Sequence, residues 1–292
     1  MNSQNSNFND KEILSVFKTL MRQKKILLTC IFVFSSLSII YSIFLPNLYK
    51  SSTLLAPSHK EESLSSKLNL GSFSSIAGFA GVNLPGEGSS PSKEAIERIK
   101  SFEFFSSYFL PHIQLEDLLA SKGWSTEKDE ILYDSKKFDA NSKKWVRKFK
   151  FPQKQTPSDQ EAYREFTRIL QISEDTKTSF VTISISHHSP KIAKDWLDKI
   201  ILGINKSMSE EDKKNAENSI NFLNEIYNNT NFESLKDSIN ILMESQMQTF
   251  MLASSNKNYI YKILDSPIAP EKKSSPNRSI ICILGFLLGT IL

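Results

Sequence analysis

Cysteine is scarce in this chain of 292 residues, which contains only Cys30 and Cys282. Both lie inside apolar segments near opposite ends of the sequence, so we expect them not to pair and predict no disulfide framework. Histidine is also scarce, and the four histidines include one adjacent pair, His187 and His188. Neighbouring strand side chains point to opposite faces and do not readily share one ion, so we predict no metal centre.

Sequence motifs of common catalytic sites are missing. The chain contains no GxxxxGK(S/T) phosphate-binding loop and no GxSxG nucleophile elbow. The carboxylates of Glu210, Glu211 and Asp212 stand in a charge-rich stretch that is typical of a solvated helix face. The net charge of +4 comes without a nucleic-acid recognition motif. We therefore predict no catalytic residue, no cofactor and no nucleic-acid partner.

Charged residues are also absent from two apolar runs that bracket a polar middle. The first run, Ile26 to Leu45, contains no Asp, Glu, Lys or Arg. A helix of that length rises ~30 Å, about the thickness of a bilayer's hydrocarbon core. The second run begins near Ser279 and is still apolar at Leu292. Because this second run is too short to span a bilayer, we expect the chain to end inside a second crossing.

Basic residues are distributed unequally around the first run. Four precede it and one closely follows it, namely Lys18, Arg22, Lys24, Lys25 and, after the run, Lys50. By the positive-inside rule, this asymmetry predicts a cytoplasmic N-terminus and an external middle. A cleaved signal peptide is the alternative, but the run is long for that and no Ala-x-Ala-like site follows before Pro46. The predicted domains are a cytoplasmic segment at 1–25, a first transmembrane helix at 26–45, an external domain at 46–278 and the start of a second transmembrane helix at 279–292.

The external domain contains both strand and helix signals. The strands predicted from apolar alternation are 49–56, 170–172, 180–186 and 259–264, and we expect the second and third of these to pair with each other. We expect the last strand to pair beside the first, which would bring the two apolar runs together. A helix capped by Ser92 and carrying an apolar stripe to Phe105 is predicted, and another at 160–169. The polar, basic segment 122–158 is predicted to form a hairpin or loop, and 57–92, with the apolar patch 76–82, a loop. An amphipathic helix is predicted at 13–21.

A long helical hairpin is the clearest local signal. Ser189-Pro190 supplies a cap and a proline at the first helical position. No proline interrupts 191–227, which would extend ~55 Å as one helix. The sequence Asn228-Asn229-Thr230-Asn231 breaks the pattern, and a second helix follows from Leu235. The sequence therefore predicts an α+β fold, in which a base formed by 46–189 and 254–278 carries a protruding helical hairpin at 190–253.

A basic and aromatic cluster occupies Lys143 to Lys150. Aromatic rings can stack on sugar faces, and cations can bind phosphates or acidic sugars. The candidate glycan contacts are Lys144, Trp145, Arg147 and Lys148. A charged, exposed strand with its aromatic side chains turned inward is the alternative explanation of the same pattern.

The second apolar run contains the small-xxx-small pair Gly285 and Gly289, which permits close helix approach in a membrane. A proline-rich approach precedes it, with Pro267, Pro270 and Ser275-Pro276. This approach and the two glycines resemble the signature of Wzz-type chain-length determinants, the polysaccharide co-polymerases of bacterial surface glycans. The other similar stretches are Ser75 to Gly78, Lys93 to Ala95, Lys144 to Arg147, His188 to Trp196, Met251 to Ala253 and Pro270 to Lys273.

The resemblance implies a regulator without catalytic activity. Such proteins are two-span, homo-oligomeric proteins of the inner membrane with a periplasmic domain, and they set the length of a lipid-linked glycan made by a Wzy-type polymerase. It also implies that the prolines fix the entry of the second helix while the glycines let it pack closely. The residues expected to couple the domain to the membrane are Pro267, Pro270, Ser275, Pro276, Gly285 and Gly289.

The sequence departs from the pattern in the spacing before its glycines and leaves two alternatives open. Only eight residues separate Pro276 from Gly285, which is fewer than usual in the resembled family. The first alternative is a membrane adaptor that activates a tyrosine kinase for capsule or exopolysaccharide export. The second is the periplasmic sensor domain of a signalling receptor.

Overall fold

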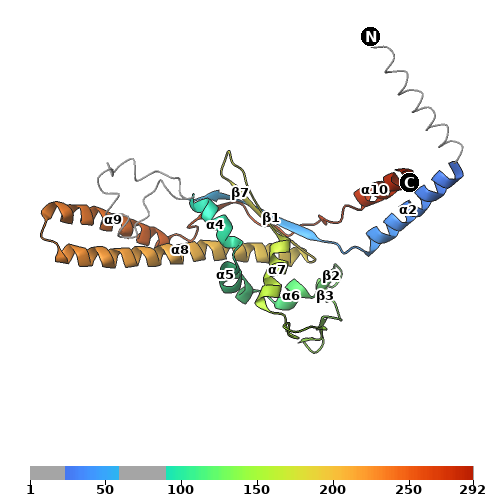
Figure 1. The fold of residues 1–292 in the computed structure, drawn as a ribbon, viewed down its shortest axis with the longest axis horizontal. Helices are drawn as coiled ribbons and strands as arrows, with labels where there is room; N and C mark the ends of the chain where they lie inside the picture. The colour runs from blue at the N-terminus through green and yellow to red at the C-terminus, as the bar shows by residue number, and fades with distance from the viewer. Residues whose placement is uncertain (1–23, 59–89, 292) are drawn as a thin grey trace, which may run out of the picture. The chain divides into compact units, whose positions relative to one another are not determined.

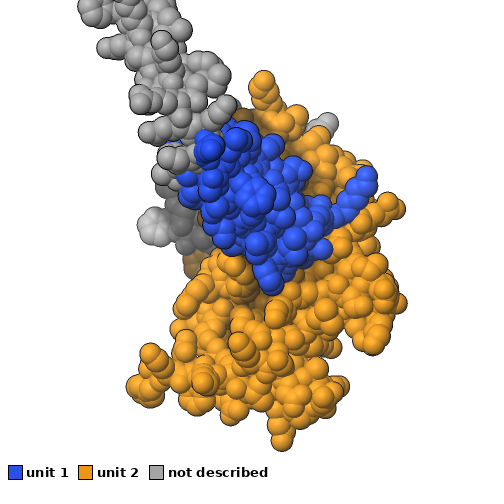
Figure 2. Space-filling model, turned by 90° about the vertical axis from the view of Figure 1, so that its right-hand side faces the viewer, with its two compact units in different colours: residues 1–48, 272–292 blue, residues 49–271 orange. Residues whose placement is uncertain are grey.

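The computed structural model describes residues 24–58 and 90–291. The chain forms two compact units (Figures 1 and 2). Unit 1 comprises residues 1–48 and 272–292, and unit 2 comprises residues 49–271. The expected amphipathic helix at 13–21 and the apolar patch at 76–82 lie outside the described residues.

Unit 1 is an antiparallel pair of helices, α2 (Lys24–Phe44) and α10 (Arg278–Ile291). Their direction follows from their contacts, because Gly285 lies against Ser38 whereas Gly289, further along α10, lies against Ile31, earlier in α2. The pairing therefore brings the two apolar runs together, as the sequence predicted. Among the described residues, no helix meets the length and hydropathy that a membrane crossing requires.

Unit 2 is built on a four-stranded antiparallel sheet with the order β6-β7-β1-β8. Its strands are β1 (Tyr49–Pro57), β6 (Leu170–Glu174), β7 (Val181–His187) and β8 (Tyr261–Asp265). The predicted pairing of the first strand with the last is confirmed, since Leu55 lies opposite Ile263. The predicted pairing of β6 with β7 is confirmed as well, whereas the pairing of β1 with β7 was not foreseen.

Alternation along β7 places Val181, Ile183 and Ile185 on a fully buried face of the sheet. Short helices cover this face together with the first half of α8, and their aromatic side chains form much of the core. These elements are α4 (Pro91–Ile99), α5 (Phe102–Phe104), the π-helix η3 (Phe105–Phe109), the 3-10 helix η4 (Leu110–His112), α6 (Leu115–Leu119) and α7 (Asp159–Ile169).

The single helix predicted from Ser92 to Phe105 is wrong in two respects. Its N-cap is Ser90, because Pro91 takes the first helical position, where its missing N–H costs nothing. The helix also ends at Ile99, and Ser101 caps a new one by accepting a hydrogen bond from the Phe104 N–H. Ser92 instead lies buried, with its hydroxyl 3.1 Å from the Tyr261 hydroxyl.

The predicted helical hairpin is present as α8 (Pro190–Asn229) and α9 (Glu233–Ser255), which lie side by side in Figure 1. Ser189 caps α8, and Pro190 stands at its first position, as the sequence predicted. The first half of α8 belongs to the core of the base. The second half packs on α9 through a small separate cluster of Leu223, Ile239 and Leu242.

The segment 122–158 contains two small antiparallel sheets and a loop. The first sheet pairs β2 (Ser121–Ser125) with β3 (Glu130–Tyr133), and the second pairs β4 (Phe138–Asp139) with β5 (Lys144–Trp145). The loop after β5 runs to α7, whose start carries a complete capping box between Ser158 and Glu161. This part of unit 2 holds the basic and aromatic cluster.

Candidate functional site

Glycines hold α2 and α10 at unusually short range in unit 1. A Cβ atom placed on Gly289 would lie 2.7 Å from the Cα of Ile31, which is backbone and cannot swing aside. A Cβ atom on Gly285 would lie 2.7 Å from the Ser38 hydroxyl and closer still to the Ser38 Cβ. Both glycines are buried. The geometry therefore leaves no room for a side chain at either position.

Serines on α2 complete this interface. The Ser38 hydroxyl donates a hydrogen bond of 2.7 Å to the Ile281 carbonyl of α10. Ser42 lies one turn further along and is buried, and no partner for its hydroxyl lies among the described residues. Sequence reasoning singled out the glycines and missed these serines. Their spacing of four residues, which places them on one helix face, is the signal that could have identified them.

The outer surface of the helix pair is apolar. Large hydrophobic side chains project from both helices away from their contact, among them Phe32, Leu37 and Phe44 of α2 and Leu284, Phe286 and Leu288 of α10. In water such a surface would be costly, since soluble proteins rarely expose contiguous apolar patches of this kind. The unit thus has small residues inside and large apolar residues outside.

The proline-rich approach to α10 begins in unit 2. Pro267 is buried and Pro270 is partly buried, just after β8 ends at Asp265. Prolines lack the N–H needed for a strand ladder, and the hydroxyls of β1 replace that ladder here. The Thr53 hydroxyl donates to the Asp265 carbonyl at 2.6 Å, and the Ser51 hydroxyl donates to the Ile268 carbonyl at 2.8 Å. The prolines thus lie in a segment fixed against the start of β1.

The approach continues in unit 1, where it pairs with the segment after α2. The Leu48 N–H donates to the Ser275 carbonyl at 2.9 Å, and the Ser274 N–H donates to the Leu48 carbonyl at 2.8 Å. Arg278 of α10 donates a hydrogen bond of 3.2 Å to the Asn47 side chain. Pro276, partly buried, follows this bridge directly. The two chain segments that leave the helix pair are therefore tied together, and a role for these prolines in membrane coupling stays a prediction.

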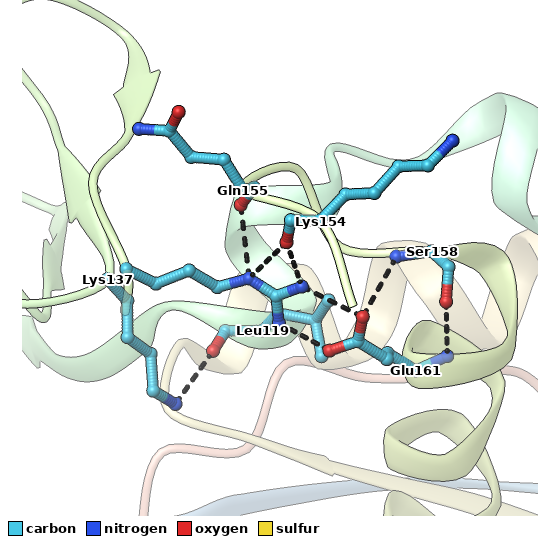
Figure 3. A network of polar contacts seen from close by, with 7 residues as sticks. Leu119, Lys137, Lys154, Gln155, Ser158 and Glu161 are labelled. Atoms are coloured by element: carbon cyan, nitrogen blue, oxygen red, sulfur yellow. Dashed lines mark hydrogen bonds and ion pairs between the residues drawn. The ribbon is translucent and has the colours of Figure 1, made fainter. Parts of the chain in front are cut away.

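Arg147 belongs to the basic cluster in unit 2, and its partners are internal; Figure 3 labels three of them, Lys154, Gln155 and Glu161. Its guanidinium forms a two-pronged ion pair with Glu161, with one of the two contacts at 2.8 Å. It also donates to the Lys154 carbonyl at 2.6 Å and to the Gln155 carbonyl at 3.0 Å. The hydrogen bonds from Arg147 lower the pKa of the Glu161 carboxyl. Arg147 thus binds the loop to the start of α7.

Trp145 is likewise engaged within unit 2. Its ring packs edge-on against Phe138 with ring centroids 5.3 Å apart, and Phe138 in turn contacts Tyr133. The structure therefore gives two of the four candidate glycan contacts internal partners and leaves Lys144 and Lys148 exposed. The alternative foreseen from the sequence, with the aromatic side chain turned inward, holds for Trp145, but Phe149 is exposed. Glycan contact at this cluster stays untested.

His187, at the end of β7, is buried in unit 2, which the sequence did not indicate. It is buried against the Trp196 ring at 4.8 Å, and its Nδ1 accepts a hydrogen bond from the Ser189 N–H. Nε2 therefore carries the proton and donates to the Asp117 carbonyl at 3.0 Å. Burial lowers the pKa of His187 to about 4. No group of three or more potential metal ligands occurs within 24–58 or 90–291.

Comparisons with known proteins bear on these observations. Residues 10–109 match the family model of the Wzz chain length determinant proteins, which confirms the resemblance over about a third of the chain. No curated protein matches the sequence. A full-length bacterial polysaccharide co-polymerase is similar in structure, with 12% identity, a TM-score of 0.37 and coverage of 94% of this chain and 92% of that one. A fragment of WzzB, a polysaccharide co-polymerase from Salmonella Typhimurium, has 12% identity, a TM-score of 0.32 and coverage of 78% and 100%.

Proposed function

We propose that this chain regulates the length of a surface polysaccharide, lipopolysaccharide O-antigen or a related glycan, without catalysing a reaction itself. In this proposal α2 crosses the inner membrane and α10 begins a second crossing, residues 1–25 lie in the cytoplasm and residues 46–278 lie in the periplasm. Several copies of the chain assemble and act on a Wzy-type polymerase and its lipid-linked glycan. The predicted domain boundaries, with the base at 46–189 and 254–278 and the hairpin at 190–253, are part of the proposal.

The helix pair is the observation that supports this proposal best. Its glycine and serine contact and its apolar exterior are what helix association in lipid requires, because lipid provides no hydrophobic drive to bury large side chains between helices. The stretch Ile26 to Leu45 also carries no charge. The match of residues 10–109 to the chain length determinant proteins supplies the function that such a membrane unit would serve.

The backbone bridge between Leu48 and Ser275 suggests how the helix pair and the external domain would be coupled. Leu48 and Ser275 are paired by backbone hydrogen bonds, and Pro276 restricts the backbone between that bridge and α10. A displacement of one helix would therefore be passed to both chain segments at once. In this proposal, contact between the helices and the polymerase biases how long a growing glycan is retained.

Deletion of the gene, followed by complementation, tests the proposal. The deletion should broaden the length distribution of the surface glycan on a gel, and the native gene should restore it. Gly289→Leu and Pro276→Leu should shift the modal length while polymerisation continues. Leu288→Ile, at the exposed neighbour of Gly289, is the matched control and should leave the ladder unchanged. An unaltered ladder after deletion, with glycan still made, would refute the proposal.

A further inference from the structure

The loop after β5 has a preformed tip, residues 148–153. At its base, Arg147 binds the carbonyls of Lys154 and Gln155 as well as the Glu161 carboxylate. Within the tip, the Gln153 N–H donates to the Lys150 carbonyl at 2.9 Å and closes a turn. Because both ends of the tip are held, binding through it would cost little additional ordering of the chain.

Cations and aromatic rings alternate along this tip, as Lys148, Phe149, Lys150 and Phe151. Phe149 is 51% exposed and Phe151 is 96% exposed. A phenylalanine with that exposure packs against almost nothing in its own chain, so its position is not explained by the fold. Exposed apolar side chains gathered at one place mark surfaces that another phase or molecule covers.

Among the described residues, most of the positive charge of this loop has no ion-pair partner. Residues 143–155 contain six basic residues and no carboxylate. Glu161, at the start of α7, is already paired with Arg147. Within the described part of the chain, Lys148, Lys150 and Lys154 form no ion pair. The tip is therefore both apolar and cationic, which is the combination that binds an anionic lipid surface.

A chain of contacts links the loop to the end of the sheet at which β1 begins. Trp145 contacts Phe138, Phe138 contacts Tyr133, and the Tyr133 hydroxyl donates to the Asp117 carboxylate at 2.6 Å. The Asp117 carbonyl accepts from His187, which lies opposite Tyr49 in the sheet. Figure 1 shows the neighbouring pair β2–β3 at the end of unit 2 opposite the turn of the α8–α9 hairpin.

This end of unit 2 is restricted by its covalent connection to α2. Four residues lie between Phe44, the last residue of α2, and Tyr49, the first of β1, so five Cα-to-Cα steps join the two. Five extended steps span at most ~18 Å. If α2 crosses the membrane, as the proposed function holds, the start of β1 stays within that distance of the end of α2.

We propose that the tip at 148–153 docks on the outer surface of the bilayer, with Phe149 and Phe151 at the boundary between headgroups and acyl chains. Lys148, Lys150 and Lys154 bind the phosphates of anionic phospholipids. This inference rests on the proposed membrane crossing. An acidic glycan offers similar charges, but pockets for small ligands are concave, whereas Phe151 is 96% exposed and offers no pocket for a sugar ring.

Spin labels on the full-length chain in bilayers test the inference. The chain, with Cys30→Ala and Cys282→Ala, is reconstituted in bilayers of phosphatidylglycerol and phosphatidylcholine, and a nitroxide is attached to Phe151→Cys. We expect this label to lose collisions with a water-soluble nickel complex and to gain collisions with oxygen. Phe232→Cys is the matched control, because Phe232 is 74% exposed at the hairpin turn and should stay accessible to nickel. Lys148→Gln with Lys150→Gln should partly restore nickel accessibility at position 151.

A third label, at Phe286→Cys on α10, separates the two proposals. If that label is in lipid while Phe151→Cys remains in water, the docking inference is refuted and the membrane crossing stands. If both labels are in water, the membrane crossing is refuted, and the docking inference with it. If Phe151→Cys remains in water and is immobilised only when an acidic polysaccharide is added, the tip is a glycan-binding surface and the lipid inference is wrong.

Discussion

The two antiparallel helix pairs of this chain, α2–α10 and α8–α9, are packed in opposite ways. In α2–α10, glycines and serines form the contact and large apolar side chains project outward. In α8–α9, Leu223, Ile239 and Leu242 form the contact, and the exposed positions of α8 carry charges such as Glu217 and Glu225. The same backbone arrangement is thus combined with different contacts, formed by small residues in α2–α10 and by larger aliphatic residues in α8–α9, although α8–α9 also exposes apolar side chains such as Phe222 and Ile241.

This difference is the one that the proposed membrane crossing of α2 would require. Removing apolar surface from water drives the association of helices such as α8 and α9. Lipid gives no such drive, so helices in a membrane associate through close backbone approach and interhelical hydrogen bonds. The predictions below test this contrast. Some place comparable substitutions in both helix pairs, and others measure a property that only one region has.

A lysine placed on the exposed face of each helix pair should have the most different effects on α2–α10 and α8–α9. Leu37→Lys, at a 58% exposed position in the middle of the uncharged run of α2, should cost about 3 kcal/mol of insertion free energy, because a lysine at the bilayer centre is poorly solvated. Ile241→Lys, at a 43% exposed position of α9, should change little. The fraction of chain that resists alkaline extraction from membranes measures the effect. Equal extraction of both variants would contradict the contrast.

A cavity in the contact should affect the α8–α9 pair next most strongly. Leu223→Ala removes a fully buried side chain and should lower the free energy of unfolding by about 2.5 kcal/mol, from lost burial and the cavity left behind. Phe222→Ala, at the exposed neighbouring position, should cost well under half of that. Urea unfolding in detergent, followed by circular dichroism, measures both. A larger loss for Phe222→Ala would show that the hairpin is covered by another surface.

Overfilling the contact should instead affect the α2–α10 pair. Gly285→Ala places a methyl group against Ser38. It should lower the free energy of unfolding, measured by urea unfolding in detergent, by about 2 kcal/mol. Adding Ser38→Gly removes the atoms that clash and should recover part of the loss in a double-mutant cycle. Gly123→Ala, whose new methyl group would lie 3.7 Å from Leu132, is the control and should fit. Additive losses for Gly285→Ala and Ser38→Gly would mean that the two residues do not contact each other.

Features with a local signal were predictable from the sequence. Ser189 and Pro190 mark the start of α8, and the alternation of Val181, Ile183 and Ile185 marks β7, because caps and side-chain periodicity act within a few residues. The break at Ser101 was missed although a serine cap was readable there. The pairing of β1 with β7 was also missed, since more than a hundred residues separate them and only tertiary packing brings them together.

The candidate sites show the same division. Gly285 and Gly289 were identified as a packing motif from their spacing, but their partners Ser38 and Ile31 depend on how α10 is placed against α2. In the basic cluster, similar residues have different surroundings. Arg147 is bound by Glu161 and Trp145 packs on Phe138, whereas Phe151 is exposed. The capping box at Ser158 and Glu161 can be recognised in the sequence. The ion pair of Glu161 with Arg147 cannot, because it depends on how the loop folds back on α7.

The smallest expected effect is a difference in how the stability of unit 1 and that of the base of unit 2 depend on pH. The stretch Ile26 to Leu45 contains no acidic or basic residue, whereas the base of unit 2 buries His187 in its neutral form with a pKa of about 4. Unfolding raises the pKa of His187 toward 6.5, so the unfolded chain binds the proton first as the pH falls. The contribution of neutral His187 to the free energy of unfolding is complete above about pH 6.5 and is lost toward pH 4. Between pH 7 and pH 5.5 the free energy of unfolding should therefore fall by about 1 kcal/mol. Urea unfolding followed by tryptophan fluorescence, for which Trp196 lies beside His187, should show this slope. His187→Gln keeps a donor for the Asp117 carbonyl without titrating, and an equally steep slope in that variant would assign the pH dependence to another group.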